Sequence, residues 1–142
     1  MVVQKESEVI MYKITLTKDQ AEVIAQALDL FSRIGCGQFE EILRHPTIVK
    51  KLYKLIDSDK YLESREEAQY GIGVAKKVIT GFEPNSSESI TIADEPNRVA
   101  YDIFQVIRNR IAWDEKPAGG MEVDFQNPMK WSEQPLPKIE HE

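Results

Sequence analysis

The chain has 142 residues, a mass of 16.3 kDa, a net charge of −6 and a pI near 5.1. This length corresponds to one domain, so residues 1–142 are treated as a single domain. The acidic balance argues against duplex nucleic acid as a partner, and one cysteine excludes an internal disulfide. Apolar runs fall far short of the roughly 18 residues that a membrane span requires. We therefore expect a soluble cytoplasmic protein with no membrane contact.

The N-terminal part combines a polar start, a predicted strand and a long helix. Residues 1–8 are polar and expected to be flexible. From 9 to 16 the side chains alternate with period two and include β-branched residues, which predicts a strand. Thr17 and Gln20 have the spacing of a capping box, and a helix with one buried face is expected from Lys18. That face comprises Ala21, Ile24, Ala25, Leu28, Phe31 and Ile34.

The middle of the chain is predicted to be helical between breaks. Gly35-Cys36-Gly37 either separates two helices or marks a place where another backbone or a ligand comes close. Helical patterns follow from Gln38 until just before Pro46, from Pro46 to about Ile56, and from about Leu62 to Ile79. The last of these helices has an acidic first turn and a basic last turn, which suits the helix dipole.

A long loop, a final helix and a second strand complete the predicted fold. Residues 80–96 have no helical period, and a helix is expected from Glu95 or Pro96 to about Ala112. Residues 121–125 alternate again and predict a strand, while 128–142 form an extended C-terminal tail on the surface or around a partner. The predicted class is α+β, a mostly helical domain with a small antiparallel sheet formed by the N- and C-terminal strands.

Side chains typical of catalysis are few. His45 and His141 have no metal-ligand spacing, so neither a metal site nor a cofactor is predicted. Cys36 has no evident base nearby and is more typical of a buried structural residue than of a nucleophile. The pairs Glu40-Glu41 and Glu66-Glu67 would suit magnesium on two helices, but neighbouring residues point about 100° apart. The residues therefore give little sign of catalysis, and we predict no catalytic residues.

The final helix concentrates positive charge. Arg98, Arg108 and Arg110 are three of the six arginines. On a helical projection Arg110 falls within the apolar arc of the helix and Arg108 falls opposite. Two interpretations of Arg110 remain open: a structural pair with a carboxylate, or an anion site at a cleft or subunit interface. Phe82, in the preceding loop, is either a plug on the core or a platform for a base.

Two stretches of the chain resemble a known family. They are ALDLFSRIGCGQFEEIL at 27–43 and RVAYDIFQVIRNRIAWD at 98–114. They are similar to the phage anti-defence proteins that block Thoeris immunity by sequestering its signal, the first such sponge family. The resemblance implies a non-enzymatic protein that binds cyclic ADP-ribose-type signals made by TIR enzymes and holds them uncleaved. It also implies a homodimer, or a hexamer built from dimers, and in some members a separate site for cyclic trinucleotides.

The resemblance also implies which residues bind the ligand. Phe82 is expected to stack on adenine, and Arg108 or Arg110 to bind phosphate. Asn97 is expected to make a polar contact. Arg33 and Gln38, beside the glycine-rich bend, are expected to face the same ligand or the trinucleotide site.

Two other classes of function remain as alternatives. A small magnesium-dependent nucleotide pyrophosphohydrolase would use the glutamate pairs. A protein-inhibiting interaction module would use the tail and apolar surface and would have no ligand pocket.

Overall fold

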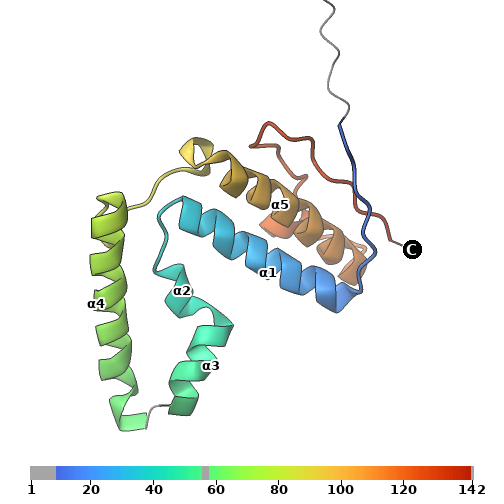
Figure 1. The fold of residues 1–142 in the computed structure, drawn as a ribbon. Coiled ribbons are helices and arrows are strands. Elements are labelled where there is room, and N and C mark those ends of the chain that lie inside the picture. The colour runs from blue at the N-terminus through green and yellow to red at the C-terminus, as the bar shows by residue number, and fades with distance from the viewer. Residues whose placement is uncertain (1–8, 56–57, 142) are drawn as a thin grey trace, which may run out of the picture.

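The computed structural model describes residues 9–55 and 58–141, and its described regular elements are helices (Figure 1). The α-helices are α1 (Lys18–Gly35), α2 (Glu41–Arg44), α3 (Pro46–Leu55), α4 (Tyr61–Thr80) and α5 (Glu95–Glu115). Three short 3-10 helices are η1 (Ser58–Lys60), η2 (Ile90–Ile92) and η3 (Val123–Phe125). None of these helices has both the length and the apolar character needed to cross a membrane. The prediction of flexibility for 1–8, and that of a helix end near Ile56, lie outside the described residues.

The predicted antiparallel sheet is wrong, because the described residues contain no strand. Residues 9–16 belong to no helix or strand, and Ile10, Tyr12 and Ile14 point into solvent. The expected second strand instead contains η3, which is held against α5 because the Asn109 amide donates to the carbonyls of Asp124 and Gln126 at 3.0 Å. Alternation allows an extended chain, but a sheet also requires a partner strand, and neither segment finds one here.

The predicted helices are confirmed with small changes at their ends, except that the one expected from Gln38 is reduced to the four residues of α2. The Thr17 hydroxyl accepts from the Gln20 backbone, and the Gln20 side chain accepts from the Thr17 backbone, which completes the expected capping box. Pro46 lies in the first turn of α3 as expected, and α5 runs one turn further than predicted. The predicted buried face of α1 is only partly correct, because Ala21 and Ala25 are buried while Phe31 is 46% exposed.

Gly35 and Gly37, at the end of α1, fit both interpretations that the sequence suggested: a break between two helices and a place of close approach. The helix ends at Gly35, and Gly37 adopts a φ of +79°, a conformation that glycine takes without strain. A Cβ atom on Gly35 would lie 2.2 Å from Cγ of Asn97, so side-chain space at Gly35 is already taken by α5. The close approach is therefore made by another helix of the same chain.

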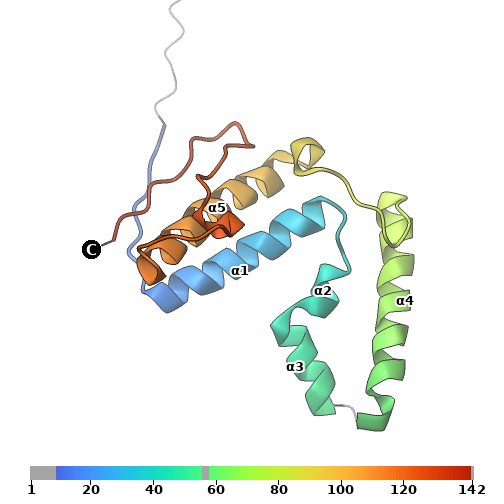
Figure 2. The same ribbon diagram turned by 180° about the vertical axis from the view of Figure 1, so that it is seen from behind.

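The core lies between α1 and α5, which run side by side in both views (Figures 1 and 2). Ala21 and Ala25 of α1 and Ile107 of α5 form its buried centre. Small side chains on α1 let the two helices approach closely. Partly buried apolar side chains extend the core; they are Leu16, Ile24, Leu28, Ile103, Phe104, Ile111 and Ile139.

A second face of α5 binds the backbone of the C-terminal segment 122–134, which we call the strap. The buried Asp102 carboxylate accepts from the backbone nitrogens of Trp131 and Ser132 at 2.8 and 3.0 Å, and from the Ser132 hydroxyl at 2.6 Å. The Gln105 amide exchanges two hydrogen bonds with the Met129 backbone. Spacings of three and four residues place the strap-binding side chains on one face of α5; they are Glu95, Arg98, Asp102, Gln105 and Asn109.

This arrangement predicts that Asp102 anchors the strap. Asp102→Asn replaces one acceptor oxygen by an amide donor that would face a backbone N–H or the Ser132 hydroxyl. We expect the free energy of unfolding, measured by urea denaturation, to fall by about 2–3 kcal/mol, the range for a lost hydrogen bond to a charged group. The matched control is Asp94→Asn, because Asp94 is exposed at the N-cap of the same helix and makes no capping hydrogen bond. An Asp102 variant as stable as the control would contradict this role.

Candidate functional site

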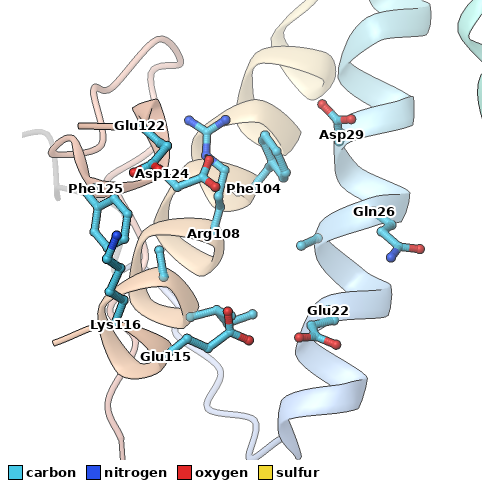
Figure 3. A pocket seen from close by; sticks show the side chains of 13 residues that line it. Glu22, Gln26, Asp29, Phe104, Arg108, Glu115, Lys116, Glu122, Asp124 and Phe125 are labelled. Atoms are coloured by element: carbon cyan, nitrogen blue, oxygen red, sulfur yellow. The ribbon is translucent and has the colours of Figure 1, made fainter. Parts of the chain in front are cut away.

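A groove of about 580 Å³ lies between α1, α5 and the strap (Figure 3). This volume is within the usual range for small-molecule sites. Its α1 wall presents Glu22, Ala25, Gln26 and Asp29. The remaining lining residues come from α5 and the segment after it: Phe104, Arg108, Ile111, Ala112, Glu115, Lys116, Glu122, Asp124 and Phe125.

Arg108 is the predicted site residue that lines this groove. Its Cζ atom lies 4.7 Å from the centroid of the Phe104 ring, a cation–π contact, and its Nε lies 3.4 Å from Oδ1 of Asp124. The geometry of that ion pair leaves Nε buried without a hydrogen bond. Figure 3 shows the guanidinium between Phe104 and Asp124. Its two terminal nitrogens make no hydrogen bond to the described residues, so they are available to a ligand with acceptor oxygens.

The burial of the two candidate arginines is the reverse of the sequence expectation. The Arg108 side chain is 23% exposed, whereas that of Arg110 is 41% exposed. Arg110 pairs with Asp114 one turn later on α5, which matches the structural interpretation left open above. The projection failed because it assumed one buried face, whereas α1 and the strap cover two faces of α5 and Arg108 lies between them.

Carboxylates outnumber cations in the groove, but most of them are paired. Lys18 lies 2.6 Å from Glu115 and 3.8 Å from Glu22, and Asp29 is 3.1 Å from Nε of Arg33. These pairs are partly exposed, and each offsets local negative charge rather than contributing much stability. Opposite charges beside the groove therefore reduce the repulsion that an anion would otherwise meet.

Arg33 lines a second, smaller pocket of about 230 Å³, and Gln38 contacts Arg33 without lining that pocket. Nη1 of Arg33 donates to Oε1 of Gln38 at 3.1 Å, and Arg33 itself lines the pocket with Arg44 and His45. Both pockets include Gln26 and Asp29 of α1. Arg33 and Arg108, two of the four arginines that the sequence analysis named, therefore line neighbouring pockets that share a wall on α1.

Phe82 and Asn97 lie apart from both pockets. The half-buried Phe82 ring packs on Gly37, where an added Cβ would be 2.9 Å from its Cδ2 atom. Asn97 is buried, and its Nδ2 donates to the Phe31 carbonyl at 2.9 Å. Within one copy of the chain, the structure does not bring Phe82, Asn97 and Arg108 together. A stacking role for Phe82 stays a prediction.

The remaining candidates for catalysis have structural partners. Glu40 accepts from the fully buried Lys76 at 3.1 Å, and Glu41 pairs with Arg44 at 2.9 Å. Glu66 and Glu67 are exposed on α4. No group of three or more His, Cys, Asp or Glu side chains in the described part of the chain has the geometry to hold a metal ion.

Sequence reasoning missed Phe104, Asp124 and Phe125. Phe104 lies within an apolar helical pattern, and the other two lie in the predicted second strand, so none stood out as a site residue. Only the path of the strap brings Asp124 to Arg108 and sets Phe125 edge-on to Trp113, with ring centroids 5.3 Å apart. That path depends on contacts distant in sequence, which no local pattern reveals.

Comparison with known proteins found no matching family model, no matching curated protein and no matching solved structure.

Cys36 is 5% exposed, as a structural cysteine would be, and this predicts low reactivity. Burial raises the pKa of its thiol above the ordinary value of 9.0, with a smaller contribution from the Glu88 carboxylate and an opposing one from Arg33. We expect iodoacetamide to alkylate the folded chain at pH 8 at least about tenfold more slowly than the urea-unfolded chain. The raised pKa also makes the stability of the fold depend on pH. Below the pKa of the unfolded chain the protonated thiol stabilises the folded state, and this contribution is lost as the pH rises from the unfolded pKa through the folded pKa. Equal alkylation rates in the two states would contradict a structural role.

Proposed function

We propose that this chain is a phage anti-defence sponge that binds cyclic ADP-ribose-type signals made by TIR enzymes and sequesters them without cleavage. The observation that carries the proposal is Arg108 in its groove, held by Phe104 and Asp124, with terminal nitrogens that make no hydrogen bond within residues 9–55 and 58–141. A planar guanidinium can donate two parallel hydrogen bonds to a phosphate. The two stretches that resemble the sponge family lie mainly on α1 and α5, the helices that frame the groove.

The presence of a second pocket beside the first favours a ligand that carries more than one polar group. A phosphate on Arg108 and a further group near Arg33 would lie on either side of Gln26 and Asp29. Carboxylates such as Asp29 suit ribose hydroxyls, which donate hydrogen bonds. Cyclic trinucleotides remain part of the proposal as ligands of the second pocket, which Arg33 lines and beside which Gln38 binds Arg33.

Contacts of the glutamates favour binding over hydrolysis. A magnesium-dependent pyrophosphohydrolase needs free carboxylates that converge on the metal. Glu40 and Glu41 are instead paired with Lys76 and Arg44. These pairs give both side chains a structural use, and a sponge needs tight binding without turnover.

Mass spectrometry distinguishes these functions. The purified chain is mixed with the products of an activated TIR enzyme, freed of unbound small molecules and heated to release what it holds. We expect the cyclic signal to be released unaltered. Release of a linear or hydrolysed nucleotide would point to an enzyme, and release of no nucleotide would contradict the sponge proposal.

Replacing Arg108 should weaken ligand binding without unfolding the chain. A lost charge-assisted hydrogen bond is worth about 1.5–3 kcal/mol, so calorimetry on Arg108→Ala should show roughly ten- to a hundredfold lower affinity. Arg108→Lys should recover only part of this loss, because lysine lacks the planar fork.

Two further variants act as controls for Arg108. Arg110→Ala removes the same charge from the same helix at a position paired with Asp114, and should leave the affinity nearly unchanged. Asp124→Asn removes the carboxylate that orients Arg108 and should weaken binding, by less than Arg108→Ala does, because the guanidinium itself remains. Equal losses in both arginine variants would indicate a general effect of charge, and undiminished binding in Arg108→Ala would place the phosphate elsewhere.

A further inference from the structure

Helix α4 is poorly covered by the rest of the chain. It has 20 residues, yet its buried set within the described residues consists of Lys76 alone. Lys76 anchors its C-terminal part, because Nζ donates to Glu40 and to the Pro84 carbonyl at 2.9 Å. Near its other end Tyr61 stacks on Tyr53 of α3, with ring centroids 4.5 Å apart. Both views show α3 and α4 projecting away from the α1–α5 pair (Figures 1 and 2).

One face of α4 carries apolar side chains into solvent. Tyr70, Val74 and Val78 follow at intervals of four residues and therefore lie on one face. They are 77%, 47% and 80% exposed. Contiguous exposed apolar side chains usually mark an interaction site. Long helices in proteins also depend mainly on packing for their stability, and within the described residues only Val74 of these three side chains is about half covered.

Gly71 lies on the same face and has no use within the single chain. A Cβ atom built there meets nothing within 4 Å, unlike at Gly35, where Asn97 fills the space. Glycine inside a helix is unfavourable relative to alanine, so its presence needs another benefit. A benefit arises where a second helix crosses closely, because the missing side chain lets the two backbones approach.

The charges along this face are complementary to those of a reversed copy. Glu63, Glu66 and Glu67 lie in the N-terminal half, and Lys77 lies near the C-terminal end. In an antiparallel pair with its two-fold axis level with Ile72, Glu67 and Lys77 are each five residues from the axis. Each Glu67 then faces Lys77 of the other copy, and Tyr70 comes level with Val74. Lys77 already pairs with Glu83 at 2.9 Å, but that pair is well exposed and easily exchanged.

From these features we infer that α4 is a self-association surface that binds α4 of a second copy of this chain in an antiparallel orientation, with Gly71 close to the crossing point. Such a two-fold contact uses the same patch on both copies, so a patch that complements itself is required. The inference does not depend on the ligand proposed above.

Charge reversal tests both the surface and its orientation. Light scattering during size-exclusion chromatography of the full chain should give about twice the 16.3 kDa chain mass, or an even multiple of it. Glu67→Lys and Lys77→Glu should each weaken the dimer by about tenfold or more, because two like-charge contacts replace two attractive ones. The variant that combines Glu67→Lys with Lys77→Glu should restore the dimer, because each contact again joins opposite charges. The matched control is Arg65→Glu, an equal charge change at an exposed residue on another face of α4, which should leave the mass unchanged.

Gly71→Leu provides a test that does not risk misfolding. The side chain has open space within the chain and favours helix formation, so far-UV circular dichroism should show equal or higher helix content. The added bulk should nevertheless weaken the dimer by about tenfold or more, since it blocks the close crossing. A monomeric wild-type chain, an unchanged mass in Gly71→Leu, or a folded double variant that stays dissociated would each overturn the inference.

Discussion

The strap is held in place by a carboxylate that lies almost entirely out of solvent. Asp102 is 2% exposed and accepts three hydrogen bonds from Trp131 and Ser132. A buried carboxylate without such donors would cost several kcal/mol, so the backbone of the strap and the Asp102 side chain stabilise each other. Gln105 and Asn109 extend this contact along α5 toward η3. Because α1 covers another face, α5 is enclosed by a helix from the start of the chain and by the segment that follows α5 itself.

The groove is a consequence of this enclosure. Arg108 lies where the α1 side and the strap side of α5 meet, and Phe104 and Asp124 fix its guanidinium there. An arginine held by its flat face on Phe104 and by the ion pair to Asp124 keeps its outer nitrogens oriented with little loss of side-chain entropy on binding. The strap therefore contributes to the proposed site through Asp124 and Phe125 and through the wall that it forms.

Sequence patterns predicted local features of this fold better than distant contacts. The Thr17–Gln20 capping box and the helix from Pro46 depend on residues within one turn of each other, and both are confirmed. The sheet was wrong because alternation at 9–16 and 121–125 indicates extended chain but not a partner. Polar residues at 102, 105 and 109 resemble a solvated helix face, although they bind backbone. Arg108 was chosen as a candidate, yet its burial could not be predicted without the path of the strap.

Nuclear magnetic resonance of the arginine side chains tests most directly whether an anionic nucleotide binds at Arg108. In a chain labelled with ¹⁵N, each Nε–H group gives its own signal, and Arg108→Lys and Arg110→Lys assign two of them. A cyclic ADP-ribose isomer should shift the Arg108 signal in a saturable manner and leave that of Arg110 unchanged. The same ligand should cause no comparable shift at α5 in Arg108→Lys. Saturable shifts at other arginines with Arg108 unaffected, or no shifts at all, would contradict binding in this groove.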